Sequence, residues 1–452
     1  MTTTYTRLAA YPRPPNDNGW GFHSSSGAYE QPWMSEAWRV RFSGKSAIQS
    51  LTDADKRHIM REYARMLHDE YGIRWFKLLA GGTAQLDFLD ALVEAGIETI
   101  VRLWTDRPHP HYVAPTEVVQ QFLEHGAHYI EWGNEPNLFL EWESTAWHRG
   151  NLEEQLLDQI ERNLETITTA ALRAGVQGIP LIPSLSPGGN RDARIMFSRL
   201  MHLIRERNLQ SDFTTSAVAI HNRPHNIPPH EPATETLSVT FREYEWYDEQ
   251  IRTTLGYSLP LLGTEAGYEI GDATIPGYPR ITGDLHATYN MEIFRGFRET
   301  WHPSFFCACM WLIEIYEKNS FSFANAAWWY NKIAGGDYPE NILPAVHALR
   351  EEAAQRLFVR TMPWETPPPP ASSFADILLA EANARQVIEF NPNAALQQRI
   401  FADGFVPNSP EFALEFEGET FIAQRAEHLQ SGEVRVYYVK QGEWAQVKFI
   451  RG

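Results

Sequence analysis

The chain has 452 residues, is 43% apolar and carries a formal net charge of −18. A chain of this length and composition can bury a large core, so we expect one large domain and a smaller one. Its 57 acidic residues outnumber its 39 basic residues and no stretch is strongly basic, which argues against binding to nucleic acid or to anionic lipid.

The beginning of the sequence, "MTTTYTRLAAYPRPP", has no basic segment followed by an apolar core of signal-peptide length. No apolar run elsewhere approaches the length of a membrane span. We therefore expect a cytoplasmic protein by default, with non-classical release as the alternative and with no membrane partner. The oligomeric state stays open.

Short β-type runs alternate with amphipathic helical segments from residue 20 to about residue 360. Such alternation is typical of parallel βαβ units, and eight strand–helix units predict an α/β fold of the (β/α)8 TIM-barrel type. The alternative, an open doubly wound sheet, normally carries a G-x-G-x-x-G turn after its first strand, and "GFHSSSGAYEQPW" lacks that spacing. We predict strands at residues 19–23, 73–80, 98–104, 128–133, 180–185, 216–221, 259–265 and 304–312.

The predicted barrel domain covers residues 1–360 and ends with a helix at 342–358. The Pro-rich segment "TMPWETPPPPASS" at 361–373 predicts a linker. Residues 374–452 then form a small accessory module, which we expect to be α+β or β-rich. In this module we predict a helix at 374–388 followed by several short strands.

Two glutamates stand at predicted strand ends. Glu135, in "YIEWGNEPNLF", follows the fourth strand, and Glu265, in "LLGTEAGY", ends the seventh. Because the carboxyl ends of all barrel strands open on one face, these two carboxylates should meet at one cleft. Paired carboxylates perform glycoside hydrolysis: one protonates the leaving oxygen, and the other attacks the anomeric carbon or activates a water.

These residues carry a resemblance. Asn134-Glu135-Pro136 after strand four, Glu265 at the end of strand seven and Trp311 near the end of strand eight resemble the clan A glycoside hydrolases, cellulase-like retaining enzymes on (β/α)8 barrels. The resemblance covers about residues 20–360. It implies that Glu135 is the acid/base and Glu265 the nucleophile. It further implies that Asn134 donates to the sugar 2-hydroxyl and that Trp311 is a platform under the ring at the cleavage point.

The sequence departs from the family pattern at two strands. Members often carry His-x-Tyr at the sixth strand; here His221 can fill the histidine place, but position 223 is Arg. An arginine is expected near the end of the second strand, where this chain offers only Lys77, with Arg102 on the third strand as a substitute. A cation there matters because it keeps the nucleophile ionised while the acid holds its proton.

His23, at the end of the first predicted strand, and Trp104, after the third, complete the candidate substrate-binding residues. Sugar rings present flat C–H faces, so exposed Trp and Tyr side chains are their usual platforms. We expect two or three of the aromatic residues in the predicted strand-end loops to contact sugar. These further aromatic residues are Trp33, Trp38, Trp142, Trp147, Trp328, Trp329 and Tyr330.

Two rival interpretations concern single motifs. Glu269 in "GTEAGYE" competes with Glu265 for the role of nucleophile. His221, His225 and His230 could suggest a metal site, but three prolines break the segment and no carboxylate ligand follows at close spacing. We therefore expect no metal and no other cofactor.

The leading hypothesis is a retaining glycosidase that cleaves a β-linked glycoside or polysaccharide. The first alternative is a non-catalytic carbohydrate-binding barrel, and the second is a barrel that serves as scaffold for a C-terminal targeting module. The identity of the sugar, its linkage and internal or terminal cleavage depend on loops that the sequence does not resolve.

Overall fold

The structure is a computed structural model of the whole chain, and the part described below excludes several segments. The described residues are 3–105, 111–142, 147–148, 150–314, 325–329, 342–365, 378, 394–416, 418–428 and 431–451.

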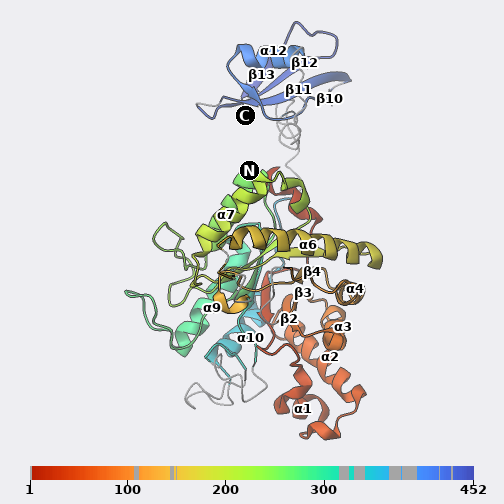
Figure 1. Cartoon of the computed structure of the whole chain (residues 1–452), viewed down its shortest axis with the longest axis vertical. Helices are drawn as coiled ribbons and strands as arrows, with labels where there is room; N and C mark the ends of the chain where they lie inside the picture. The colour runs from red at the N-terminus through yellow and green to blue at the C-terminus, as the bar shows by residue number, and fades with distance from the viewer. Residues whose placement is uncertain are drawn as a thin grey trace. The chain divides into compact units, whose positions relative to one another are not determined.

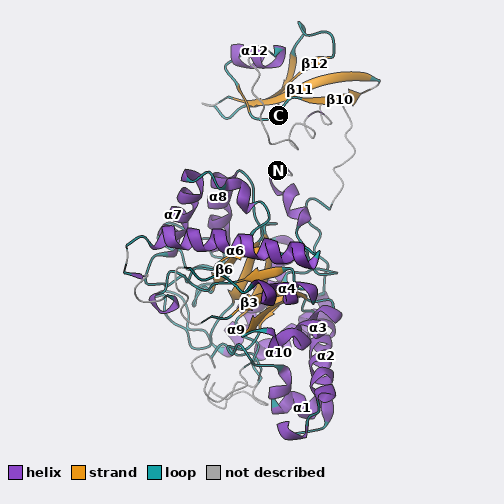
Figure 2. Cartoon of the chain, turned by 45° about the vertical axis from the view of Figure 1, so that its right-hand side comes forward, coloured by secondary structure: helices purple, strands orange, loops and turns teal. Residues whose placement is uncertain are grey.

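Eight parallel strands form a closed barrel, in the order in which they follow one another along the chain, with β8 hydrogen-bonded to β1. The sheet lies at the centre of the barrel unit, and helices surround it (Figure 1, Figure 2). The predicted TIM-barrel fold is thereby confirmed. The strands are β1 Trp20–His23, β2 Trp75–Ala80, β3 Glu98–Leu103, β4 Tyr129–Glu131, β5 Ile179–Ile182, β6 Ala217–Asn222, β7 Leu261–Ala266 and β8 Phe305–Met310.

Each of the eight strands falls within or beside a predicted run, with ends that differ by a few residues. The barrel helices are α1 Glu36–Ser43, α2 Asp53–Asp69, α3 Leu86–Glu94, α4 Thr116–Glu124, α6 Leu152–Ala174, α7 Ala193–Glu206, α8 Glu243–Leu255, α9 Gly283–Glu299 and α10 Pro344–Arg356. The last of these confirms the helix predicted at 342–358. Short 3-10 helices lie at η1 Thr3–Ala10, η2 Pro32–Met34, η3 Ile48–Ser50, η4 Thr83–Gln85, η5 Phe139–Glu141 and η6 Gln210–Phe213.

Local sequence signals explain where the helices begin and end. At the start of α2, Asp55 N–H donates to Thr52 Oγ1 at 3.1 Å while Thr52 N–H donates to Asp55 Oδ2 at 2.7 Å, a reciprocal capping box. At the end of α6, Gly175 adopts a left-handed conformation with φ of +68°, which a residue without Cβ accepts at little cost. Such caps satisfy helix-end backbone groups and allow short turns into the strands.

The eight strands carry almost only buried side chains, because one face packs on the helices and the other fills the barrel interior. Large aromatic side chains form much of this core. Trp20 stacks on Phe294 of α9 with ring centroids 5.1 Å apart, and its indole N–H donates to the Phe294 carbonyl at 2.8 Å. The polar residues at the strand ends are therefore held by a rigid, close-packed scaffold.

Contacts between residues divide the chain into two compact units, Arg7–Met362 and Met1–Thr6 with Pro363–Gly452. The second unit has its own antiparallel sheet and two small apolar clusters. Most of the predicted linker at 361–373 and almost all of the predicted helix at 374–388 lie outside the described residues. The elements of this unit are α12 Ala395–Ala402, β9 Val406–Pro407, β10 Phe412–Phe416, β11 Glu419–Glu427, β12 Val434–Lys440 and β13 Lys448–Arg451.

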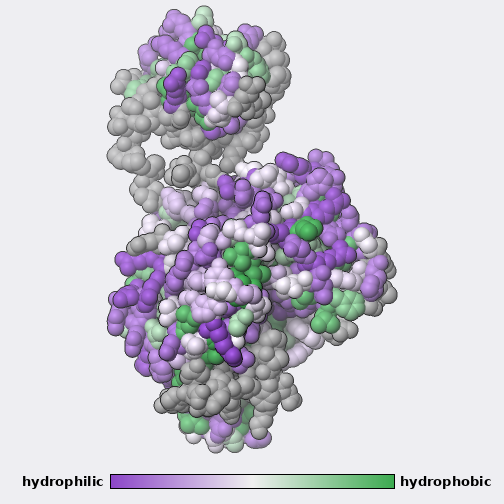
Figure 3. Space-filling model, turned by 90° about the vertical axis from the view of Figure 1, so that its left-hand side faces the viewer, coloured by the Kyte–Doolittle hydropathy of each residue, from purple (hydrophilic) through white to green (hydrophobic). Residues whose placement is uncertain are grey.

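The face of the chain in Figure 3 is largely hydrophilic, with small, separate hydrophobic patches. Exposed large apolar side chains such as Leu172 and Ile195 lie on different helices, α6 and α7. Among the helices that the structure describes, none has the length and apolar character needed to cross a bilayer.

Candidate active site

Strand register gathers charged and imidazole side chains into one layer at the carboxyl ends of the strands. Residues paired in register on neighbouring strands point to the same face of the sheet, here the barrel interior. A β-bulge between Ile220 and His221 adjusts the pairing of β6 with β7. The register pairs are His23 with Lys77, Arg102 with Glu131, and His221 with Glu265.

Glu265, the penultimate residue of β7, belongs to this layer and has a side chain that is only 8% exposed. Its Oε1 lies 3.7 Å from Lys77 Nζ, 3.5 Å from His221 Nε2 and 3.9 Å from His23 Nε2. Of these neighbours only Lys77 carries a positive charge, and a buried carboxylate needs such a cation because an isolated buried charge is very unfavourable.

Glu135 lies in the loop after β4 and its side chain is 19% exposed. Its φ is +36°, an unusual backbone conformation for a residue with a side chain, of the kind that clusters at functional sites. Burial raises the pKa of Glu135, against the opposing influence of Arg223, Arg102 and Lys77. A raised pKa suits a carboxylic acid that must keep its proton toward neutral pH.

His221 connects the two glutamates. Its Nδ1 lies 2.9 Å from Glu135 Oε1, and its Nε2 lies 2.8 Å from Ser184 Oγ and 3.5 Å from Glu265 Oε1. Burial lowers the pKa of His221 to about 4, so the ring is neutral near pH 7. A single neutral imidazole therefore separates the two candidate catalytic carboxylates, which the structure brings to one place.

The same layer contains a buried ion pair that the sequence analysis did not identify. Oε2 of Glu131, the last residue of β4, lies at an ion-pair distance of 3.0 Å from Lys77 Nζ, and both side chains are completely buried. Ser184 and Thr264 hydroxyls lie 3.5 Å from the other carboxylate oxygen, Glu131 Oε1. The available signal was a Glu inside the apolar run "HYIEWG", since a charged residue inside a buried strand needs a partner.

Arg223, at the family's tyrosine position, pairs with Glu269, the rival nucleophile. Its guanidinium carbon lies 5.7 Å from the ring centroid of Trp311, which is itself 94% buried. Trp311 also meets His23 edge-on, with centroids 4.5 Å apart. Glu269 is thus engaged with a cation after β7, while Glu265 faces the layer of histidines and Lys77.

Asn134 and Trp104 follow β4 and β3 and are among the more exposed of the candidate site residues. Asn134 Nδ2 donates to Glu141 Oε1 at 2.9 Å, and Glu141, on η5, has a pKa that burial raises. Trp104, directly after β3, is 46% exposed. Their roles toward a sugar remain predictions, as do those of the other substrate-binding residues.

The three imidazoles of the "HNRPHNIPPH" segment face three different carboxylates. His221 contacts Glu135, while His225 Nδ1 lies 3.0 Å from Asp272 Oδ2 and His230 Nδ1 lies 2.8 Å from Glu292 Oε1. Within the described part of the chain, no group of His, Cys, Asp and Glu side chains has metal-site geometry.

Several members of the aromatic set from which two or three sugar contacts are expected belong to the core. Trp38, Trp142, Trp328 and Trp329 are each at most 2% exposed. The reason is packing: Trp328 and Trp329, for instance, both meet Phe22 of β1 edge-on. Tyr330 lies outside the described residues.

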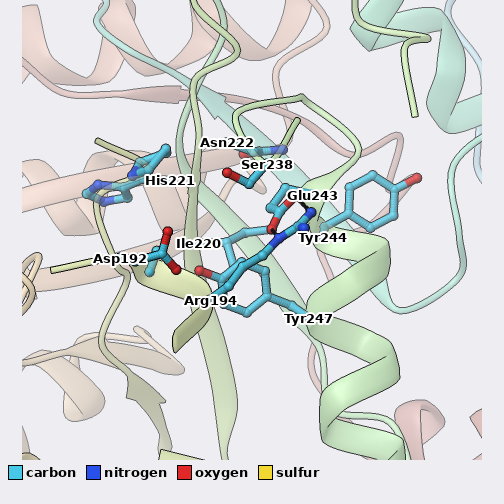
Figure 4. Close-up of a pocket in the computed structure, with 11 residues that line it drawn as sticks. Asp192, Arg194, Ile220, His221, Asn222, Ser238, Glu243, Tyr244 and Tyr247 are labelled. Atoms are coloured by element: carbon cyan, nitrogen blue, oxygen red, sulfur yellow. Dashed lines mark hydrogen bonds and ion pairs between the residues drawn. The ribbon is translucent and has the colours of Figure 1, made fainter. Parts of the chain in front are cut away.

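Two hollows lie near the site. Figure 4 shows one beside His221, a cavity of about 20 Å³ between α7 and α8, where Arg194 and Glu243 form a bidentate ion pair at 2.6 and 2.7 Å. That volume suits a water molecule rather than a sugar. A larger hollow of about 730 Å³ lies on the loop after β7, lined by Glu269, Asp272, Arg280 and Asn325 among others, and is of ligand size.

Comparisons with known proteins find likenesses among solved structures. No protein-family model matches the chain, and no curated protein matches its sequence. Bacteroides uniformis β-glucuronidase 2 shows 10% identity and a TM-score of 0.41 over 97% of this chain, which spans 47% of that enzyme. XEG5B, a GH5 xyloglucan-specific β-1,4-glucanase from a ruminal metagenomic library, shows 9% identity and a TM-score of 0.41, covering 74% of this chain and 92% of its own.

Faecalibacterium prausnitzii β-glucuronidase shows 8% identity and a TM-score of 0.36, covering 77% of this chain and 50% of its own. This chain thus spans about half the length of both glucuronidases. At such low identities and TM-scores, the function has to be inferred from the residues of the site.

Proposed function

We propose that this chain is a retaining glycoside hydrolase that cleaves a β-linked glycoside or polysaccharide, with Glu135 as acid/base and Glu265 as nucleophile. The observation that carries the proposal is the link between them: both carboxylates contact one buried, neutral His221 at the carboxyl ends of barrel strands. Two carboxyl groups in one site with opposite protonation needs are the signature of acid/base division of labour.

The surroundings supply those opposite needs. Lys77 and Arg223 act electrostatically on Glu265, whereas burial dominates at Glu135 and raises its pKa. A protonated Glu135 donates to His221 Nδ1. The single proton of the neutral ring then lies on Nε2, between Ser184 Oγ and the charged Glu265.

The reaction runs in two displacements. Glu265 attacks the anomeric carbon, the glycosidic bond breaks, and the leaving oxygen takes the proton of Glu135 and departs as an alcohol. The resulting carboxylate of Glu135 then removes a proton from a water, whose oxygen attacks the anomeric carbon and releases Glu265. The sugar leaves with its original anomeric configuration.

Removal of the nucleophile tests this proposal. Glu265→Ala should abolish hydrolysis of an aryl β-glycoside panel, and azide should restore turnover by forming a glycosyl azide of inverted configuration. Glu269→Ala is the matched control, because this carboxylate is engaged with Arg223 and should show no azide rescue. Full activity of Glu265→Ala, or azide rescue in Glu269→Ala instead, would contradict the assignment.

Lys77 and Arg223 stand where the clan A pattern has an arginine and a tyrosine. These two departures favour one second candidate, a carbohydrate-binding barrel without turnover. A barrel of that kind would bind glycans from a broad panel without releasing reducing ends. Glu265→Ala would then bind the same glycans as the unmodified chain and leave them intact, since neither protein breaks a bond.

A further inference from the structure

Arg102 is a buried cation with no partner among the residues that the structure describes. It lies on β3, is 9% exposed, and makes no hydrogen bond or ion pair with any residue in the described parts of the chain. Buried arginines are normally paired, because an unpaired buried charge forgoes its hydration without compensation. An unpaired guanidinium in a candidate active site therefore points to a ligand that supplies the missing acceptor.

The carboxylates that pair with Arg102 in strand register or feel its charge are already engaged. Glu131, its partner in strand register, is bound to Lys77. Glu135 contacts His221, and Glu141 accepts from Asn134, although both lie close enough for Arg102 to lower their pKa values. Arg102 thus acts electrostatically on two site carboxylates, yet its Nε has no hydrogen-bond partner among the described residues.

His23 presents the complementary group, an unused acceptor. Its Nδ1 lies 2.8 Å from the carbonyl oxygen of Ser24, which can only accept, so Nδ1 carries the proton. Burial lowers the pKa of His23 well below its ordinary value, so the ring is neutral and Nε2 is a bare acceptor. Glu265 Oε1, 3.9 Å from Nε2, is also an acceptor, and Nε2 has no hydrogen-bond partner among the described residues.

We propose that the sugar bound at the cleavage point is a hexuronic acid, whose carboxylate binds Arg102 and one of whose hydroxyls donates to His23 Nε2. This inference rests on the proposed glycosidase function and specifies its substrate class. The guanidinium fork of Arg matches a carboxylate with two parallel hydrogen bonds, whereas the hydroxymethyl group of a neutral hexose offers no charge. The other two cations near the site, Lys77 and Arg223, are matched by Glu131 and Glu269.

Binding of free sugars tests the proposal without turnover. D-glucuronate, D-galacturonate and D-mannuronate would be compared with D-glucose, D-galactose and D-mannose by calorimetry on the full chain. At least one hexuronate should bind roughly 10- to 100-fold more tightly than its matched hexose, as expected for a charge-assisted pair. Arg102→Met should abolish that preference, and Arg102→Lys should restore part of it.

Thermal stability distinguishes a ligand-binding role of Arg102 from a structural role. Arg102→Met removes no protein partner and replaces an unpaired charge with an apolar side chain, so its Tm should be unchanged or higher. Arg39→Met is the matched control: Arg39 is 7% exposed but donates to the carbonyls of Ser46, Trp33 and Met34, so its loss should lower the Tm. A lower Tm in Arg102→Met would show that Arg102 has a structural partner and would overturn the inference.

Hydrolysis of aryl β-hexuronides and aryl β-hexosides distinguishes this inference from the glycosidase proposal. Glu265-dependent cleavage that favours hexosides would overturn the hexuronic acid and leave the glycosidase intact. Arg102-dependent binding of hexuronate with no cleavage of either class of glycoside would support the hexuronic acid and contradict the glycosidase proposal. Cleavage of hexuronides that requires both Glu265 and Arg102 would support both.

Discussion

Lys77 Nζ lies 3.0 Å from Glu131 Oε2 inside the barrel, and neither side chain has any exposed surface. Lys77 Nζ is also 3.7 Å from Glu265 Oε1, so the ion pair lies next to the proposed nucleophile. Because each charge is desolvated, each depends on the other for compensation. The cation beside the proposed nucleophile, Lys77, is therefore already partly balanced by a second carboxylate, Glu131.

Breaking that pair should destabilise the barrel. Lys77→Met leaves Glu131 buried without its cation, which costs about 3–5 kcal/mol of unfolding free energy, whereas Lys77→Met/Glu131→Leu should recover much of that loss. The measurement is the urea unfolding midpoint of the two single variants and the double variant. Additive losses in the double variant would show that the two side chains do not compensate each other.

Removal of the acid should affect poor leaving groups most. Glu135→Gln cannot donate a proton, so kcat/KM should fall about 10²- to 10⁴-fold for alkyl or sugar leaving groups and far less for dinitrophenyl glycosides. Steady-state kinetics over a series of aryl leaving groups checks this. Glu141→Gln is the control, since that carboxylate contacts Asn134 rather than His221 and should not alter leaving-group dependence. Equal losses in Glu135→Gln across the series would exclude the acid role.

The pH profile should respond to Arg223. Burial raises the pKa of Glu135 and Arg223 opposes that rise, so Arg223→Gln should raise the pKa further. Because the acid acts when protonated, activity is lost as pH rises through this pKa. The basic limb of kcat/KM should therefore move to higher pH, by up to about one unit. The control is Arg242→Gln, which removes a pair with Glu245 on α8. A basic limb that moves to lower pH in Arg223→Gln would contradict the expected direction of the pKa change.

Buried histidines should make the fold acid-sensitive. Burial lowers the pKa of His286, on α9, to about 4, below the ordinary value of 6.5. The unfolded chain thus binds more protons between these values, so stability is complete above about pH 6.5 and falls as pH drops toward 4. His286 should account for about 2 kcal/mol of this loss at pH 5. His286→Gln should flatten the dependence of the urea midpoint on pH between 7 and 5, and exposed His202→Gln should leave it unchanged.

Many features of the fold could be predicted from the sequence. The strands that carry Glu135 and Glu265 are short apolar runs separated by capped amphipathic helices, and both kinds of signal act over a few residues. Strand order in the barrel follows chain order, so the position of each carboxylate at a strand end already predicted a common face. The same local signals could not separate core residues such as Trp328 and Trp329 from candidate sugar platforms, since nothing nearby in the sequence shows that Phe22 covers them.

The sequence by itself determined the (β/α)8 architecture and the nomination of Glu135 and Glu265, because periodicity, caps and strand ends are local. Only the tertiary structure decided which charge meets which: Lys77 with Glu131, Arg223 with Glu269, and Arg102 with none in the described chain. Those partners are far apart in sequence, or side by side only through strand register. Their pairing depends on how the closed barrel aligns its strands, and electrostatic energy depends on the resulting distances and burial.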